Sequence, residues 1–244
     1  MLHIGLSLIV YGRTINGGVR VGYYSHYEKL AYWYFRLNGV LTIQNFVVHP
    51  DIGSNQETDV DILGIRLPYR AENLLEPMVD DPIFTTVKEK LYIVIAEIKE
   101  GPCSLNGPWT KPERKNMLRV LRAIGAFEEM ELNEAAAAIY EQGFYENERY
   151  RVSLFCVGEK ENEEVKQKYK EVPQITWDNI FEFIYNRFKN YERQKVSHGQ
   201  WEYGDKLWDM YKKARNLGEF KEEFLKSQFS QNERGDQHTR NNAQ

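Results

Sequence analysis

The chain has 244 residues, 42% of them hydrophobic and 14% aromatic, which is enough for one sizeable core or for one core with a C-terminal annex. The formal net charge of −4 at pH 7 excludes a protein that is basic overall, so local basic patches must carry any contact with nucleic acid. No stretch approaches the roughly eighteen apolar residues of a membrane-spanning helix, so we expect no membrane contact.

The cysteines and the N-terminal segment favour a cytoplasmic protein. Cys103 and Cys156 have no metal-ligand spacing, and so few cysteines indicate a reduced, intracellular setting. Residues 1–10 are apolar but lack the basic region and the cleavage site of a signal peptide, so we expect a buried first strand or a partly ordered leader. A glycine-rich phosphate loop is absent from the sequence, so the chain should not hydrolyse ATP itself.

The predicted elements of residues 1–158 follow the order helix, three strands, helix, strand. Ser25 as N-cap and Glu28 as its capping-box partner predict a helix over 25–38, which Gly39 ends. Apolar, β-branched runs predict four strands, over 40–48, 58–66, 91–99 and 150–157. Three strands without intervening helices indicate a meander, and a helix over 112–124 indicates a crossover to the fourth strand. The predicted fold class is therefore α/β with a mixed sheet.

The rest of the chain divides into an insertion, a helical extension and a tail. Residues from about 67 to 90 read as an insertion with one short helix, and residues 159–227 as a helical extension packed on the core. The polar tail, residues 228–244, is predicted to be disordered. The other predicted elements are a helix over 132–142, a solvated helix or loop over 159–171, a helix over 177–191 capped by Thr176, and a helix over 205–216.

Acidic residues alternate with apolar ones in the second predicted strand. Asp59 and Asp61 are expected to share one face of the sheet, and Val60 and Ile62 the other, because successive side chains of a strand point to opposite faces. Either aspartate can therefore face a site at this strand, and the choice between Asp59 and Asp61 stays open.

The third predicted strand is apolar until it reaches Glu97 and Lys99, which share a face. Burying a carboxylate and an ammonium is costly unless they pair or bind a metal. Magnesium prefers oxygen ligands, with one or two carboxylates and the other positions held by water and phosphate. If the two strands are neighbours, Asp61 and Glu97 can hold one such ion, and Lys99 can orient or deprotonate a water. The alternative interpretation is a surface ion pair at a strand end.

The stretch from Asp59 to Gly64 (DVDILG), followed by Ile95 to Gly101 (IAEIKEG), resembles the PD-(D/E)xK nuclease superfamily, which has the restriction-endonuclease-like fold. The resemblance covers roughly residues 20–158. It implies a metal-dependent endonuclease that hydrolyses phosphodiester bonds, usually in DNA, with Mg²⁺ or Mn²⁺. The superfamily is common in restriction and phage-defence systems, and many members work as homodimers or with an ATPase.

Carried over to this chain, the resemblance implies that Asp61, Glu97 and Glu28 are catalytic residues and metal ligands. It adds the backbone carbonyl of Ile98 as a further ligand and assigns activation of the water to Lys99. The chain departs from the family pattern because no proline precedes Asp61 and because residues 67–89 must be an insertion. The capping box with Ser25 explains Glu28 without any chemistry.

Four basic residues are predicted to form a stripe on one face of the helix over 112–124, namely Lys111, Lys115, Arg119 and Arg122. The stripe can contact backbone phosphates of DNA, or it can be an ordinary solvated face. Trp109, in the preceding loop, can stack on a base, cover the site or simply pack.

Two other functional interpretations remain. In one, the same fold has lost its catalysis and binds nucleic acid or a partner protein. In the other, the chain is a structural scaffold, which predicts that Asp61 and Glu97 lie too far apart to share an ion.

Overall fold

The computed structural model describes residues 26–53, 57–195 and 202–227. The Ser25 cap, the apolar N-terminal segment and the polar tail lie outside these described residues. Within them, no helix combines the length and the apolar character needed to cross a membrane.

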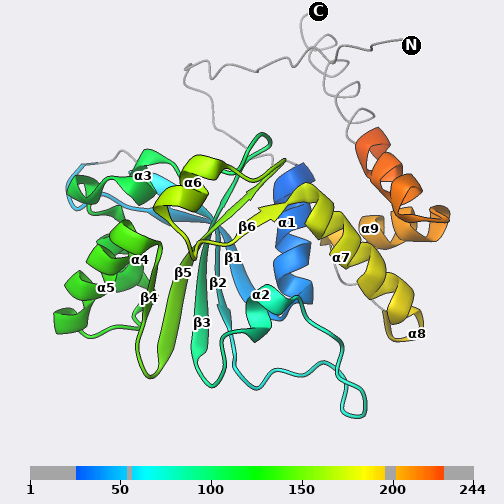
Figure 1. Cartoon of the computed structure of the whole chain (residues 1–244), viewed down its shortest axis with the longest axis horizontal. Helices are drawn as coiled ribbons and strands as arrows, with labels where there is room; N and C mark the ends of the chain where they lie inside the picture. Colours follow the sequence, from blue (N-terminus) through cyan, green and yellow to red (C-terminus); the bar gives the residue numbers. More distant parts are fainter. Residues whose placement is uncertain (1–25, 54–56, 196–201, 228–244) are drawn as a thin grey trace, which may run out of the picture.

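A six-stranded mixed sheet forms the centre of the molecule, in the order β1-β2-β3-β5-β4, with β6 beside β5 (Figure 1). The strands are β1 (Val40–Val48), β2 (Thr58–Arg66), β3 (Leu91–Ile98), β4 (Phe144–Glu146), β5 (Tyr150–Gly158) and β6 (Gln174–Thr176). Strands β1, β2 and β3 form an antiparallel meander, and β5 lies parallel to β3. The α/β class, the mixed sheet, the meander and the crossover are confirmed.

Two short strands were not predicted from the sequence. Strand β4 pairs antiparallel with the start of β5, and β6 pairs parallel with its end, both on the side of β5 away from β3. Each has three residues, too few to show a period of two in the sequence.

Helices cover the two faces of the sheet (Figure 1). On one face, α1 (His26–Leu37) and α7 (Trp177–Asn190) pack their apolar residues, including Leu30 and Ile180, against side chains such as Val94. We call this core the α1/α7 cluster. On the other face, α4 (Asn116–Ile124) and α5 (Glu129–Gln142) pack against Ile95 and Leu154, and we call this core the α4/α5 cluster.

The predicted cap of α7 is confirmed. The Thr176 hydroxyl accepts a hydrogen bond from the Asn179 backbone N–H, and the Asn179 side chain accepts one from the Thr176 backbone N–H. This reciprocal pair satisfies two backbone donors at the start of the helix. The apolar face of α7 then lies in the same core as α1, which joins the C-terminal helices to the sheet.

The remaining helices are short or peripheral. They are α2 (Pro82–Thr85), α3 (Gly107–Thr110), the 3₁₀-helix η1 (Pro112–Arg114), α6 (Glu163–Lys168), α8 (Glu192–Lys195), α9 (Glu202–Lys213) and a helix over 217–227. Helix α2 is the one short helix expected in the insertion. The helix over 217–227 was not predicted, although Asn216 accepts a hydrogen bond of 3.0 Å from the Glu219 N–H in the manner of an N-cap.

The continuous helix predicted over 112–124 is wrong. The chain forms η1, then Lys115 adopts a left-handed conformation with φ 55°, and α4 begins only at Asn116. A left-handed residue cannot continue a right-handed helix, so the first turn is rotated away from the rest.

An ion cluster anchors the insertion between β2 and β3. The buried Asp80 carboxylate accepts hydrogen bonds of 2.8 Å from Arg66 on β2 and 2.9 Å from Arg187 on α7, and of 2.6 Å from Arg70 within the insertion. A buried carboxylate with several guanidinium partners is satisfied, whereas the loss of one partner leaves charge uncompensated. The insertion is therefore tied to both the sheet and α7.

Candidate active site

Strands β2 and β3 separate at the point where the acidic residues lie. Their last paired residues are Ile62 and Ala96. Beyond this pair, β3 continues its pairing with β5 through Glu97, while β2 stays paired with β1. Asp61 and Glu97 are thus the first residues on either side of a fork between neighbouring strands. A fork of this kind places polar side chains at the rim of the sheet while the strands themselves stay in the core.

The Asp61 carboxylate of β2 binds the backbone of β3 across this fork. Its Oδ2 accepts a hydrogen bond of 2.6 Å from the backbone N–H of Ile98, the residue after Glu97. Burial, and next the negative charge of Glu97, raise the pKa of Asp61 from 3.8 to about 7, with a further contribution from Glu28. The Ile98 N–H and the Lys99 ammonium act on this pKa in the opposite direction. The structure therefore brings Asp61 and Glu97 together, as the nuclease interpretation requires and the scaffold interpretation does not.

The predicted alternation of side chains in β2 is wrong at Asp61. Val60 packs in the α4/α5 cluster and Ile62 in the α1/α7 cluster, although they were expected to share a face. On the neighbouring strand, Asn45 lies between the pairs that join β1 to Ile62 and to Val60, and it has a positive φ of 48°. The pleat thus inverts at Asn45 and Asp61, and the Asp61 carboxylate turns toward the backbone of β3. Local distortions of this kind re-aim a side chain at the cost of regular pairing.

The two candidate aspartates of β2 differ in their surroundings. Asp61 stands at the fork and binds the backbone of β3, whereas Asp59 pairs with Val47 of β1 two residues farther along the strand. Both side chains are half-buried. The geometry therefore favours Asp61 as the aspartate of the site.

Glu97 is held by three donors. Its side chain is only 4% exposed, and its Oε2 accepts a hydrogen bond of 2.7 Å from the indole Nε1 of Trp109. Its Oε1 accepts hydrogen bonds from the Asn106 amide and from the Lys99 ammonium. A buried carboxylate needs such partners, because each unpaired oxygen would carry a large desolvation cost. Lys99 and Glu97 therefore lie on the same side of the strand end, as expected.

Asn106 and Trp109 donate hydrogen bonds to Glu97 that were not predicted from the sequence, although Trp109 was expected to stack on a base, cover the site or pack. The single turn α3 follows Asn106 directly and contains Trp109, so one short element delivers both donors to Glu97. Trp109 is 1% exposed and packs in the α4/α5 cluster, so its ring is not available to stack on a base. The sequence did contain one signal for these contacts. Both residues have side chains that can donate hydrogen bonds, and both follow shortly after the Glu97-Ile98-Lys99 segment.

Glu28 lies in the first turn of α1 and is half-buried. Its charge raises the pKa of Asp61, which places it within electrostatic range of the site. Its predicted capping partner, Ser25, lies outside the described residues. In the ranges that the structure describes, no group of three or more His, Cys, Asp or Glu side chains converges as a metal cage. The site offers instead two carboxylates from adjacent strands, with the Glu28 charge nearby.

The predicted basic stripe does not form on one helix. Lys111 and Lys115 precede α4, and Arg119 is paired with Asp51 at 2.8 Å. Arg122 is paired with Glu129. The break at Lys115 separates the residues that a continuous helix would have aligned. The prediction that these four residues line one face of a single helix is therefore wrong.

Two basic side chains lie beside the loop whose residues Asn106 and Trp109 donate hydrogen bonds to Glu97. A Cβ on Gly107 would lie 3.6 Å from a side-chain carbon of Lys111 and 3.8 Å from the guanidinium carbon of Arg114. Gly107 follows Asn106 directly, so these cations lie at the rim of the site rather than on α4. Arg114 was not among the predicted contact residues.

Comparison with protein-family models, with curated proteins and with solved structures found no match to this chain.

Proposed function

We propose that this chain is a metal-dependent endonuclease of the PD-(D/E)xK type that hydrolyses phosphodiester bonds in DNA. The observation that carries the proposal is the fork between β2 and β3. There the Asp61 carboxylate binds the Ile98 N–H, beside Glu97, and Lys99 contacts Glu97. The restriction-endonuclease-like fold and a place in a prokaryotic defence system belong to the same proposal and rest on the sequence resemblance.

The side chains at the fork suit a hard divalent cation. Asp61 and Glu97 supply only oxygen ligands, the kind that Mg²⁺ and Mn²⁺ prefer, and the carbonyl of Ile98 can add another. Two neighbouring carboxylates repel each other, and a cation between them would relieve this repulsion. When bound, such an ion lowers the pKa of a coordinated water and stabilises charge on the attacked phosphate.

The protein residues have distinct roles in this proposal. Asn106 and Trp109 fix the orientation of the Glu97 carboxylate, as partners of metal ligands commonly do. The Lys99 Nζ orients the attacking water while it is an ammonium, or accepts the proton of the water after it has released its own proton to solvent. Lys111 and Arg114 attract the phosphate backbone of the DNA to the rim of the site. These contacts to phosphate carry no base specificity.

Cleavage of supercoiled plasmid by the purified full chain tests the proposal. The wild type is expected to cut in the presence of Mg²⁺ or Mn²⁺ and to stop when a chelator is added. Asp61→Ala should remove cutting, because one of the two converging carboxylates is lost. Asp59→Ala is the matched control, since it removes a half-buried aspartate from the same strand away from the fork, and it should still cut. Equal cleavage by the wild type and Asp61→Ala would mean that the site is assigned wrongly.

A second candidate function is a subunit of the same fold that binds nucleic acid or a partner without cutting. One observation favours it, because both Glu97 oxygens already have protein donors and the carboxylate is satisfied without an ion. This function predicts that the wild type retains DNA in a binding assay but never cuts it, with either metal.

A further inference from the structure

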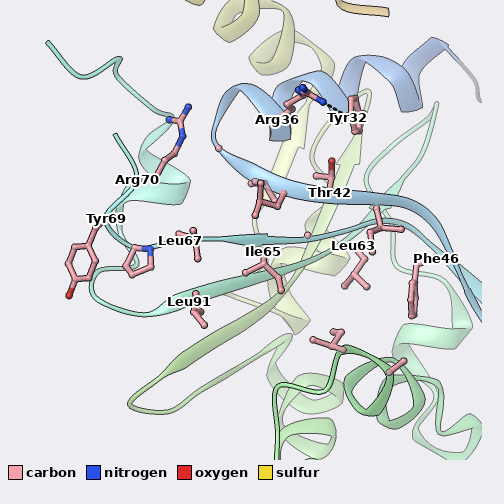
Figure 2. A pocket seen from close by; sticks show the side chains of 18 of the residues that line it. Tyr32, Arg36, Thr42, Phe46, Leu63, Ile65, Leu67, Tyr69, Arg70 and Leu91 are labelled. Carbon is pink, nitrogen blue, oxygen red and sulfur yellow. Dashed lines mark hydrogen bonds between the residues drawn. The ribbon is translucent and has the colours of Figure 1, made fainter. Parts of the chain in front are cut away.

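The hairpin of β1 and β2 extends beyond the fork of the candidate active site. Three further pairs join the two strands past Asp61, the last of them between Val48 and Thr58. Phe46 and Val48 pack with the α4/α5 cluster. Figure 2 shows Phe46, which also lines a groove of about 1410 Å³ along β1 and β2, on the side of β1 that faces α4. We call this extension, together with residues 49–53, the β1/β2 arm, and it is held against the α4 side of the molecule.

Arg119 of α4 joins the tip of the β1/β2 arm to the rim of the site. Its guanidinium donates hydrogen bonds of 2.8 and 3.3 Å to the Asp51 carboxylate. It donates another, of 2.7 Å, to the backbone carbonyl of Arg114. The Arg114 side chain lies beside the loop whose Asn106 binds Glu97. A continuous series of contacts therefore connects the tip of the arm with the fork.

The surface next to the tip of the arm is basic. The hydrogen bond and the charge of Arg119 lower the pKa of Asp51, and the charge of Lys115 adds to this effect. Lys115 therefore also lies near the tip. Counting only the carboxylates that the structure describes, Lys111, Arg114 and Lys115 form no salt bridge. Cations without carboxylate partners attract the phosphates of a nucleic acid.

Ile52 occupies the tip of the arm, directly after Asp51, and it is 94% exposed. The ion pair of Asp51 with Arg119 ties this part of the arm to α4. A single exposed isoleucine is ordinary on most protein surfaces. Beside cations that contact phosphates it has a specific use, because apolar side chains of DNA-binding proteins enter between base pairs and partly unstack them.

We propose that the β1/β2 arm contacts duplex DNA and that Ile52 inserts between neighbouring base pairs, while Arg114 and Lys115 bind the adjacent phosphates. The arm extends beyond Asp61, so a duplex that bends at Ile52 can follow the surface from the tip to the fork. The inference rests on the proposed function, because it takes DNA as the ligand. It adds that the substrate is a duplex, distorted by the protein beside the site.

Fluorescence of short duplexes that carry 2-aminopurine tests the insertion, since this base becomes brighter when it is unstacked. The full chain with Asp61→Asn is the parent protein, so that DNA is bound but not cut. A set of duplexes, each labelled at a different position, is expected to show a rise of at least about twofold at one or more positions. Ile52→Ser should remove this rise and weaken DNA binding by about tenfold, because serine cannot act as an apolar wedge.

Two further variants serve as controls. Ile52→Leu should keep both the rise and the affinity, because leucine is a large apolar side chain as well. Leu74→Ser removes an equally exposed apolar side chain from the insertion between β2 and β3, and it should behave like the parent. Circular dichroism should be the same for all variants, since both positions are exposed to solvent.

Three results would overturn the inference. One is a parent that binds DNA without a rise at any position, as expected if the tip instead contacts a protein or only solvent. The second is equal fluorescence and affinity in the parent and Ile52→Ser. The third is the same loss in Leu74→Ser as in Ile52→Ser.

Plasmid cleavage by the wild type judges the proposed function separately. A wild type that never cuts, with a rise that depends on Ile52, would remove the proposed function and leave this inference in place. A wild type that cuts, with no effect of Ile52→Ser on fluorescence or affinity, would remove the inference alone.

Discussion

Replacing Lys99 with methionine is expected to lower the rate of DNA cleavage by about 10²- to 10⁴-fold, the usual contribution of a group that transfers or positions a proton. Methionine keeps much of the apolar stem of the side chain and removes the ammonium that contacts Glu97. Glu97 keeps its hydrogen bonds to Asn106 and Trp109, so the carboxylate should stay in place. The loss should therefore fall on the rate of the cleavage step, measured in single turnover, and not on folding.

Lys90→Met is the control for this substitution. Lys90 immediately precedes the opposite end of β3 and pairs with Glu146, so it has a similar ion-paired setting far along the strand from the fork. The Lys90→Met variant should cleave DNA at nearly the wild-type rate. Cleavage by Lys99→Met at the wild-type rate would remove Lys99 from the mechanism.

Asp61→Asn is expected to stabilise the metal-free protein at alkaline pH while it removes cleavage. The pKa of Asp61 in the folded state is about 7, against 3.8 as its ordinary value, chiefly because of burial and next because of the charge of Glu97. Between these two values the folded state binds more protons than the unfolded state, so the free energy of unfolding falls as the pH rises. Above about pH 7 the charged Asp61 lowers the free energy of unfolding by its full amount, which is at most about 4 kcal/mol.

Urea unfolding in the presence of a chelator measures this effect. Asparagine has no charge to lose and can still accept the hydrogen bond from the Ile98 N–H. The variant and the wild type should therefore be similar in stability near about pH 4, and the variant should gain steadily up to about pH 7. Adding Mg²⁺ should raise the stability of the wild type but not of the variant, because only the wild type has both the Asp61 and the Glu97 carboxylates to bind the ion. The ion should therefore reduce the difference in stability between them. A difference that does not change with pH would show that Asp61 carries no such penalty.

Much of the sheet could be predicted from the sequence because its long strands carry strong local signals. The strands at 40–48 and 58–66 have the predicted bounds, and β3 ends one residue before the predicted end. The break in the helix at Lys115 has no such signal, because lysine ordinarily favours the helix and its left-handed φ is set by the fold around it. The inversion of the pleat at Asp61 is also non-local. It depends on Asn45, which is in a different strand.

Part of the candidate site could also be predicted from local signals in the strands. Asp61, Glu97 and Lys99 stand out because charges are rare within apolar strands, and the meander brings β2 beside β3. The hydrogen bonds from Asn106 and Trp109 to Glu97 were not predicted, because loop residues give no periodic signal and only the three-dimensional path of α3 brings them to Glu97. The basic residues were misplaced because their alignment depended on a helix that begins later than expected.

The central claim is that the carboxylates of Asp61 and Glu97 jointly hold one divalent ion, and calorimetric titration with Mn²⁺ tests it most directly. We expect the wild type to bind Mn²⁺ at one site, Asp61→Asn and Glu97→Gln each to weaken binding by at least about tenfold, and Lys99→Met to keep it. Binding of Mn²⁺ by Asp61→Asn and Glu97→Gln with the affinity of the wild type, or no binding by the wild type at all, would contradict the claim.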